Sequence, residues 1–329
     1  MQEQAFWVSR GRGEIRPVAV GGPAAGQVRV RTVRSAISRG TETLVFRGGV
    51  PVDQYDRMRA PHQDGEFPGP VKYGYLSVGV VEDGDAGLLG RTVFCLHPHQ
   101  TAYVVPATDV TVVPDGVPAE RAVMAGTLET AVNALWDAAP LIGDQIAVVG
   151  AGMVGCCVAR LLAAVPGVEV TLVDVDPTRA EIAEVLGVAF AHPAEVSGDR
   201  DLVLHASATA AGLQRSLELL AADGEVIDLS WYGDVPVRLD LGGAFHSGRL
   251  RIRASQVGDV ALRRRHRRTR SQRLALALDL LRDPAYDALL TGSSPFEDLP
   301  IVMAELATGR RTALCHTITY SSAHDPWRA

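Results

Sequence analysis

Residues 145–155 read Gln-Ile-Ala-Val-Val-Gly-Ala-Gly-Met-Val-Gly, an apolar run that ends in three closely spaced glycines. The run predicts a buried strand, and the residues after the glycines predict a helix that extends to about Leu162. In such a turn Gly150 permits the tight bend, Gly152 lets the backbone approach a phosphate, and Gly155 lets the helix pack close to the strand. The stretch therefore predicts the pyrophosphate-binding turn of a dinucleotide-binding domain.

A second strand-like run, 168–173, supports this interpretation. It is followed by Asp174, 24 positions after Gly150. That spacing is close to the roughly 20 residues expected for an acid that binds the ribose hydroxyls. Because a carboxylate there would repel a 2′-phosphate, the sequence predicts NAD rather than NADP. Arg179 opposes this prediction, since a nearby arginine can accommodate the phosphate.

Further candidates for cofactor binding lie in the first helical turn and after two later strands. The helix begins at Met153 and Val154, so its free N–H groups would face the pyrophosphate. Two later strand-like runs are followed by Ser207 and by Ser230 and Trp231. Because ligands bind at the carboxyl edge of open α/β sheets, we expect the two serines to line the ribose and nicotinamide path. Trp231 would form a wall of the cleft.

Two kinds of pattern divide the chain. Residues 1–132 read mostly as β-structure, with period-two alternation at 27–33 and turns rich in glycine and proline. Further strands are expected at 71–82, 91–96 and 101–105. Residues 133–260 alternate strand and helix, which predicts a doubly wound parallel sheet. After these, the sequence predicts a helix near 297–308 and a strand near 312–320. The expected fold is therefore α/β, with a barrel-like β domain and a Rossmann domain.

Composition limits the possible functions. A length of 329 residues suggests about two domains, and a net charge of −6 argues against a nucleic-acid partner. The sequence shows neither a membrane span nor a secretory signal. Its four cysteines show no disulfide framework, so a reducing cytoplasm is the expected setting. The arginine run at 263–270 predicts a solvated helix entry, with a bound polyanion as the alternative.

The order of a β domain, a Rossmann domain and a short α/β return resembles the medium-chain dehydrogenase/reductase superfamily. The segment 35–42, which contains Ser-Arg-Gly-Thr-Glu, is similar to the superfamily's first active-site loop. This form is similar to a zinc-independent subgroup that includes the bacteriochlorophyllide hydroxyethyl dehydrogenase. The resemblance implies that residues 1–132 and 261–329 form a GroES-like catalytic domain and that residues 133–260 form the Rossmann domain. It also implies a homo-oligomer, either a dimer or a tetramer.

The sequence departs from the zinc pattern of this superfamily. Ser38 stands at the usual cysteine position, Tyr75 at the usual histidine, and Leu76 at the usual glutamate. Glu129 is the one remaining ligand, whereas a catalytic zinc site needs three protein ligands. The sequence therefore predicts no metal. The alternative is a rebuilt zinc site in which His97 and His99, on one face of a strand, join Glu129.

Alcohol oxidation without zinc requires a side chain that accepts the hydroxyl proton. Lys72, the only lysine, is one candidate, because burial would lower its pKa; a carboxylate partner is its structural alternative. Tyr75 is another, because it replaces the metal-binding histidine, and a packed aromatic ring is its alternative. Glu42 and Thr41 could form a proton relay, or they could cap a helix.

Three further residues complete the set of catalytic candidates. Arg39 could bind an anionic or polyhydroxyl substrate, or it could be an ordinary surface charge. Glu129 could orient the substrate or pair with Lys72, and an internal salt bridge is its alternative. His99 could relay protons to solvent, or it could be a hydrogen-bonded strand histidine.

These observations lead to one preferred hypothesis and two rivals. The preferred one is an NAD-dependent, zinc-independent oxidoreductase that interconverts a secondary alcohol and a ketone on a polar cyclic or polyol-like small molecule. The first rival is an enoyl or quinone reductase of the same fold, which commonly uses NADPH. The second is a non-catalytic dinucleotide-binding sensor, which the polar replacements at the active-site loop disfavour.

Overall fold

The computed structural model describes residues 2–321, in which the chain forms two compact units. Unit 1 comprises Met1–Gly126, Leu278–Arg282 and Leu290–Ala329, and unit 2 comprises Thr127–Ala277 and Asp283–Leu289. This division by compactness places residues 261–277 in unit 2, whereas the sequence assigned them to the catalytic domain. The domain boundaries at 132 and 261 stay predictions, and residues 322–329 of the expected return segment lie outside the described residues.

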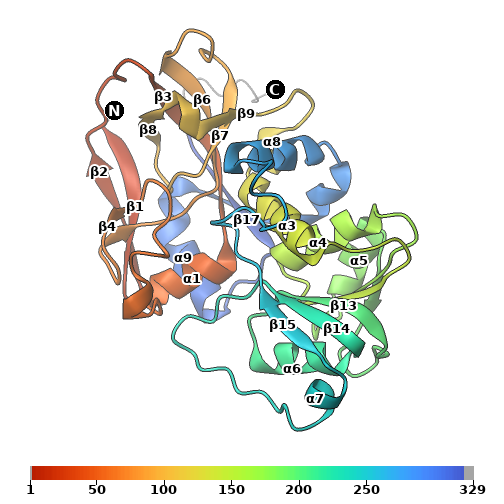
Figure 1. Ribbon diagram of the computed structural model, residues 1–329. Helices are drawn as coiled ribbons and strands as arrows, with labels where there is room; N and C mark the ends of the chain where they lie inside the picture. Colours follow the sequence, from red (N-terminus) through yellow and green to blue (C-terminus); the bar gives the residue numbers. More distant parts are fainter. Residues whose placement is uncertain (1, 322–329) are drawn as a thin grey trace. The chain divides into compact units, whose positions relative to one another are not determined.

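Unit 2 contains a six-stranded parallel sheet in the order β12-β11-β10-β13-β14-β15 (Figure 1). Counted along the chain, this is the 3-2-1-4-5-6 order of dinucleotide-binding Rossmann sheets. The predicted doubly wound parallel sheet is therefore confirmed. Its strands are β10 (Gln145–Val149), β11 (Glu169–Val173), β12 (Ala189–Ala191), β13 (Arg200–His205), β14 (Leu220–Asp228) and β15 (Arg251–Ala254).

Helices cover both faces of this sheet because its central strands are apolar on both sides. A Cβ on Gly155 of α4 would lie 3.5 Å from Val148 Cγ1, which places α4 on one face of β10. Leu213 of α6 packs with Ala147 and Val149 on the other face. The helices are α3 (Ala125–Ala138), α4 (Met153–Ala163), α5 (Arg179–Leu186), α6 (Ala210–Glu218), α7 (Ala244–Ser247) and α8 (Arg270–Leu280), with the 3₁₀ turn η3 (Pro284–Leu289).

Unit 1 contains two sheets, as expected for the barrel-like β domain. A four-stranded sheet has the order β2-β1-β5-β4, and a seven-stranded sheet has the order β16-β17-β3-β6-β7-β9, with β8 also paired to β3. The strands are β1 (Glu3–Ser9), β2 (Arg12–Val18), β3 (Gln27–Ile37), β4 (Asp64–Gly65), β5 (Val71–Lys72), β6 (Ser77–Gly84), β7 (Thr92–Cys95), β8 (Ala102–Pro106), β9 (Val110–Val112), β16 (Leu290–Pro295) and β17 (Cys315–Thr319).

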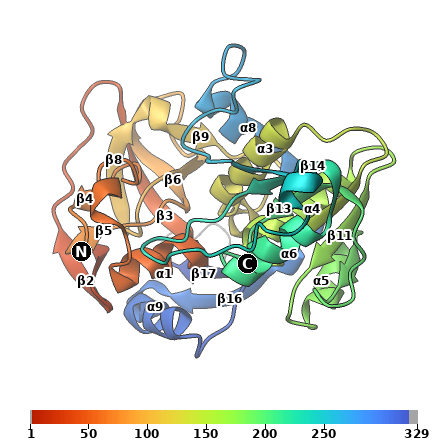
Figure 2. The same ribbon diagram turned by 60° about the horizontal axis from the view of Figure 1, so that its bottom comes forward.

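Short helices connect these strands, and the C-terminal strand completes the larger sheet. The helices are α1 (Arg39–Arg47), α2 (Ala119–Ala122) and α9 (Leu299–Thr308), with 3₁₀ turns η1 (Val52–Gln54), η2 (Ala107–Asp109) and η4 (Phe296–Asp298). Figure 2 shows α9 and β16 as one continuous C-terminal segment beside α1. β17 pairs antiparallel with β3, from His316 opposite Ile37 to Thr319 opposite Arg34. The C-terminal return therefore joins the first domain, as the resemblance implied.

One expected strand is interrupted. The sequence predicts a continuous strand at 71–82, but the backbone forms β5, an irregular segment at 73–76, and then β6. Gly74 has φ of +131°, which side-chain-bearing residues rarely adopt, so the strand breaks there. The break matters for the site because Lys72 ends β5, whereas Tyr75 lies in the irregular segment that follows.

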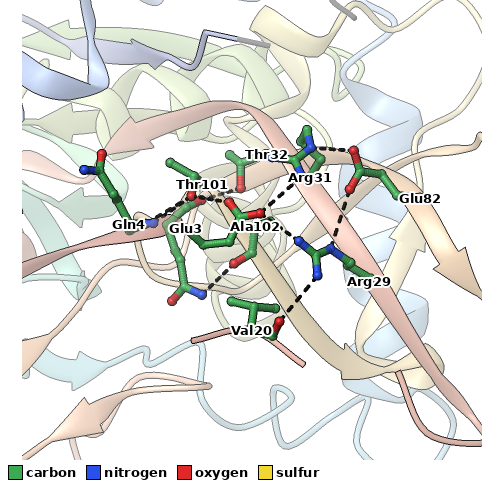
Figure 3. A network of polar contacts seen from close by, with 10 residues as sticks. Glu3, Gln4, Val20, Arg29, Arg31, Thr32, Glu82, Thr101 and Ala102 are labelled. Atoms are coloured by element: carbon green, nitrogen blue, oxygen red, sulfur yellow. Dashed lines mark hydrogen bonds and ion pairs between the residues drawn. The ribbon is translucent and has the colours of Figure 1, made fainter. Parts of the chain in front are cut away.

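A polar network fastens the N-terminal strand to the larger sheet (Figure 3). Glu3 of β1 accepts hydrogen bonds from Arg29 at 2.7 Å and Arg31 at 3.2 Å, both on β3. Thr101 donates its hydroxyl proton to the same carboxylate at 2.7 Å. The two arginines also pair with Glu82 of β6. Burial alone would raise the pKa of Glu3, but the bonds from Thr101 and Arg31 outweigh burial and lower it.

Glu3→Gln is expected to lower the free energy of unfolding by about 1 kcal/mol at neutral pH. Because the folded-state pKa is depressed, this stabilisation is present above the unfolded pKa and is lost as pH falls through the folded pKa. Urea unfolding at about pH 7 and about pH 3 checks this, since the variant and wild type should converge in acid. Glu14→Gln on the exposed strand β2 is the control, and an equal effect from both variants would contradict the assignment.

In residues 2–321 no helix has the length and apolar character needed to cross a membrane. All four cysteines are buried thiols. Residues 263–270 form an exposed turn that leads into α8, and Arg270 pairs with Asp259 at 3.3 Å. The arginine run is therefore an exposed helix entry.

Candidate functional site

The glycine turn has the geometry that its sequence predicts. Gly150 has φ of +106°, and its N–H donates to the Val173 carbonyl at 2.8 Å. A Cβ on Gly155 would lie 1.8 Å from the Gly150 carbonyl oxygen, so a side chain there would disrupt the turn. Gly152 caps α4 with no side-chain hydrogen bond, and Met153 is the first helical residue. The backbone N–H groups of the first turn, including that of Val154, therefore remain available to an anion.

Asp174 follows β11 and contacts the glycine turn directly. Its Oδ2 accepts a hydrogen bond from the Ala151 N–H at 2.6 Å, and its Oδ1 accepts from the Asp176 N–H at 2.9 Å. The half-buried carboxylate is thus held at the end of the sheet beside the phosphate-binding turn. Arg179 begins α5 and pairs with Asp176 at 3.2 Å. Asp174 and Arg179, which bear on the choice between NAD and NADP, therefore lie at the end of β11 and at the start of α5.

The other predicted cofactor residues follow β13 and β14, at the carboxyl edge of the parallel sheet. Val149 of β10 is opposite His205 of β13, and a Cβ on Gly150 would lie 2.6 Å from the Ser207 nitrogen. Ser230, after β14, accepts a hydrogen bond from the Ala208 N–H at 3.1 Å. Trp231 is half-buried in the same segment. Ser207 therefore lies against the glycine turn, at the position where ligands of such sheets bind.

In unit 1 a buried chain of hydrogen bonds runs through the predicted relay residue Glu42. Glu42 lies in α1, and its Oε2 is 2.9 Å from His99 Nε2. His99 Nδ1 is 2.7 Å from the Ser35 hydroxyl on β3, which is 2.8 Å from the Tyr320 hydroxyl after β17. All four side chains are buried. Ser38, which precedes α1, donates its backbone N–H to Glu42 Oε1 at 2.8 Å.

The proton positions in this chain follow from its chemistry when Glu42 is ionised. A carboxylate can only accept, so His99 carries its proton on Nε2 and presents Nδ1 as an acceptor. Ser35 must then donate to Nδ1 and accept from Tyr320. Burial raises the pKa of Tyr320, which keeps its hydroxyl protonated as the donor. The arrangement is a continuous donor–acceptor series that can hold or shift one proton.

Tyr75 lies beside this chain. Its hydroxyl donates to the Ser38 hydroxyl at 2.7 Å, and Thr41 also bonds to it. Burial raises the pKa of Tyr75 to about 12, since the bonds from Ser38 and Thr41 oppose burial only in part. A Cβ on Gly74 would lie 2.9 Å from the His99 ring, so a glycine here allows the ring to pack against the backbone next to Tyr75. The structure therefore brings Tyr75, Thr41, Glu42 and His99 together.

The other catalytic candidates have different partners. Lys72 is buried and donates to Gln100 Oε1 at 2.8 Å, with Asp64 at 3.9 Å. Burial lowers the pKa of Lys72, and Asp64 opposes this effect. The suggested pairing of Lys72 with Glu129 is wrong, because Glu129 instead forms a buried salt bridge at 2.9 Å with Arg273. Arg39 is exposed at the start of α1.

The rebuilt zinc site does not form among residues 2–321. His97 and His99 follow β7 in irregular backbone, and they share no partner. His97 stacks on Tyr103 with ring centroids 3.7 Å apart, whereas His99 bonds to Ser35 and Glu42. In the described part of the chain no group of three or more His, Cys, Asp or Glu residues could hold a metal ion. The side chains at the usual zinc position, Ser38 and Tyr75, thus do not fit this metal.

Sequence analysis missed several members of these networks. Tyr320 joins Ser35 across 285 positions in the chain, and no local pattern indicates this contact. His205 and Asp228 at the ends of β13 and β14 were also missed as functional candidates. The sequence did carry a signal for them, because each is a polar residue at the end of an apolar strand. The carboxyl ends of parallel strands form the edge of the sheet at which ligands bind.

No protein-family model and no curated protein matches the sequence. Solved structures do match along nearly the whole chain. An E. coli CFT073 protein named short chain alcohol dehydrogenase (rspB), in complex with NADH, has a TM-score of 0.75 and 15% identity, covering 97% of this chain and 100% of that one. A putative zinc-binding dehydrogenase from Sinorhizobium meliloti 1021, bound to NADP, has a TM-score of 0.77 and 16% identity, covering 97% and 99%.

A third match is 2R,3R-butanediol dehydrogenase from Bacillus subtilis, with a TM-score of 0.75 and 15% identity, covering 96% of this chain and 99% of that one. The chain has the fold of these dehydrogenases. This confirms the expected combination of a GroES-like domain and a Rossmann domain. At such low identities the likeness concerns the fold, so the chemistry must be argued from the residues of this chain.

Proposed function

We propose that the protein is an NAD-dependent oxidoreductase that interconverts a secondary alcohol and a ketone by hydride transfer, without zinc. The observation that carries the proposal is the replacement of zinc ligands by Tyr75 and Ser38 beside the buried Glu42–His99 pair. Non-catalytic loss of a metal site would not require such a connected polar chain. The fold and the glycine turn supply the cofactor part of the argument.

The residues of unit 2 fit a dinucleotide. The first turn of α4 would bind the pyrophosphate through its backbone N–H groups, and the space beside Gly152 is open. Asp174 would accept hydrogen bonds from the ribose hydroxyls. Ser207, Ser230 and Trp231 would line the remaining path. When bound, the nicotinamide supplies the hydride acceptor for alcohol oxidation.

Tyr75 and the buried chain supply the proton chemistry. Because its pKa is raised to about 12, Tyr75 keeps its proton at neutral pH and would donate it to a substrate carbonyl oxygen in place of the Ser38 hydroxyl. Glu42 links the two parts, since its oxygens bind the Ser38 N–H and His99. The His99 ring then offers a buried place for the proton released from the alcohol. We assign Tyr75 the contact with the substrate oxygen, and Glu42 and His99 the handling of the proton.

The substrate class is proposed from the polar character of the site. The hydroxyls of Tyr75, Ser38 and Thr41 favour a polar cyclic or polyol-like small molecule over a long apolar chain. Arg39, exposed at the start of α1, would contribute to binding such a substrate. The four buried cysteine thiols accord with the reducing cytoplasm that we propose as the setting. We also propose a homo-oligomer, which size-exclusion chromatography with light scattering would test.

Asp174→Asn is expected to lower the preference for NADH over NADPH by roughly tenfold or more, because it removes the charge that repels a 2′-phosphate. An asparagine has one acceptor oxygen, so it can keep the bond from the Ala151 N–H but loses the bond from the Asp176 N–H. Fluorescence titrations of wild type and variant with both dinucleotides measure the effect. Asp201→Asn is the control, because Asp201 binds the Gln145 N–H at the other end of β10.

These titrations also test the proposed function itself. Tight NADH binding by the wild type, with a preference that depends on Asp174, would support it. If the wild type prefers NADPH and Arg179→Ala removes this preference, the enoyl or quinone reductase hypothesis gains support instead. If neither dinucleotide binds at millimolar concentration, the oxidoreductase proposal is wrong.

A further inference from the structure

A second hydrogen-bonded series lies in unit 2, at the carboxyl ends of β13 and β14. The Ser207 hydroxyl is 2.7 Å from His205 Nε2, and His205 Nδ1 is 2.9 Å from Asp228 Oδ1. The His205 side chain is fully buried, whereas Asp228 is 12% exposed and Ser207 is half-exposed. The three side chains are thus linked in series by two hydrogen bonds, with the serine at the more accessible end.

The direction of these hydrogen bonds follows from the surroundings of Asp228. Burial alone would raise the pKa of Asp228, but the bond from His205 and the bond from the Ser230 N–H outweigh burial and lower it. The ionised carboxylate also accepts from the Tyr232 hydroxyl at 3.0 Å. It therefore accepts a hydrogen bond from the Nδ1–H group of His205, and the neutral ring then presents Nε2 as an acceptor. The Ser207 hydroxyl then donates to Nε2, the arrangement in which a histidine acts as a base on a serine.

The backbone around Ser207 holds its side chain at a tight junction between β13 and α6. Ala208, the next residue, has φ of +53°, which is uncommon for a residue other than glycine. A Cβ on Gly212 of α6 would lie 2.1 Å from the Ser207 hydroxyl oxygen, so only glycine leaves room for it. Thr209, the N-cap of α6, contacts the same oxygen at 3.0 Å. The positive end of this helix therefore lies beside Ser207 and would favour negative charge there.

We propose that Ser207, His205 and Asp228 form an acyl-transfer site of the serine hydrolase type, whose substrates are small carboxylic esters. The Ser207 oxygen bonds to the ester carbonyl carbon while His205 takes the hydroxyl proton. The bond to the alcohol then breaks, and His205 gives the proton to the departing alcohol. Water, deprotonated by His205, releases the carboxylic acid and restores Ser207. This activity needs no dinucleotide, so it does not rest on the proposed oxidoreductase function.

The position of the serine also predicts competition with a dinucleotide. The Ser207 nitrogen lies against Gly150 of the glycine turn, so an ester at Ser207 and a pyrophosphate on that turn would occupy neighbouring space within unit 2. Ester cleavage is therefore measured without dinucleotide. In that form the result is independent of whether the protein oxidises alcohols.

The test uses a fluorophosphonate probe, which reacts with activated serines, on the full chain, with mapping of the labelled peptide. We expect labelling of Ser207, none in Ser207→Ala, and at least about 100-fold slower labelling in Asp228→Asn. Asp228→Asn keeps the shape of the side chain and an oxygen acceptor, and circular dichroism verifies that it folds. Ser247→Ala is the control, because Ser247 is an exposed serine of the same unit and its loss should change neither labelling nor folding.

Hydrolysis of p-nitrophenyl acetate provides the second measurement. The proposal predicts turnover that Ser207→Ala abolishes and Asp228→Asn reduces in parallel with labelling. Absence of label on Ser207 in the folded wild type would overturn the proposal. Label on Ser207 that forms equally fast in Asp228→Asn would also overturn it, because the serine would then be exposed without being activated.

Discussion

Glu42→Gln is expected to lower kcat for alcohol oxidation roughly 100-fold, the lower end of what positioned proton transfer contributes. Glu42 accepts hydrogen bonds from His99 at 2.9 Å and from the Ser38 N–H at 2.8 Å. A glutamine has one acceptor and one donor group in place of two acceptors. It cannot keep both bonds unless the proton on His99 moves from Nε2 to Nδ1. That move would reverse the direction of the hydrogen bonds through Ser35 and Tyr320.

Several measurements separate this effect from simple structural damage. The variant should keep its dinucleotide affinity, because Glu42 lies in unit 1, and its pH profile for kcat should change shape. Glu66→Gln is the matched control, since Glu66 pairs with Arg59 at the surface and its loss should leave kcat unchanged. A Glu42→Gln variant with wild-type kcat and an unaltered pH profile would show that the buried chain is structural only.

Arg273→Ala is expected to lower the free energy of unfolding by about 3–5 kcal/mol, because it leaves a buried carboxylate without its partner. Arg273 is 1% exposed, and its Nε donates to Glu129 at 2.9 Å. Its other nitrogens donate to Asn133 and to the carbonyls of Val257 and Asp259. Burial raises the pKa of Glu129, and Arg273 opposes that rise without cancelling it. Removal of Arg273 therefore leaves the buried carboxylate without its ion-pair partner and several carbonyl groups without a hydrogen-bond donor.

Urea unfolding of the wild type and three variants measures this effect. Arg270→Ala is the matched control, because Arg270 is 67% exposed and should contribute less than about 1 kcal/mol. The double variant Arg273→Met with Glu129→Leu should recover part of the lost stability, since it removes the charge as well as its partner. If Arg273→Ala unfolds at the same urea concentration as Arg270→Ala, the buried pair is not important for stability.

The part of the fold that follows from local pattern was predictable. The glycines at 150–155 and the alternation of strand and helix after them predict a parallel sheet, and the structure contains that sheet. The irregular segment at 73–76 was not predictable from alternation. It depends on Gly74, whose positive φ allows the His99 ring to approach the backbone, and this contact is between residues distant in sequence.

The candidate site was predictable in its positions but not in its partners. The resemblance indicated Glu42, Thr41 and Tyr75, and residue type and spacing indicated His99. The structure joins Tyr75 to Glu42 through Ser38, and Glu42 to His99 directly. Charge alone suggested Lys72 and Glu129 as a pair, but each is satisfied by a different neighbour, Gln100 and Arg273. Long-range side-chain pairing of this kind depends on tertiary packing, which residue type and spacing do not encode.

The central claim is direct hydride transfer to NAD⁺ by a protein without zinc. The most direct measurement incubates NAD⁺ with cyclic secondary alcohols that carry deuterium on the carbinol carbon, using protein whose metal content is known from elemental analysis. The account predicts deuterium in the reduced nicotinamide with substoichiometric zinc, and no loss of rate after treatment with a chelator. Transfer that requires one zinc per chain, and that a chelator abolishes, would contradict it.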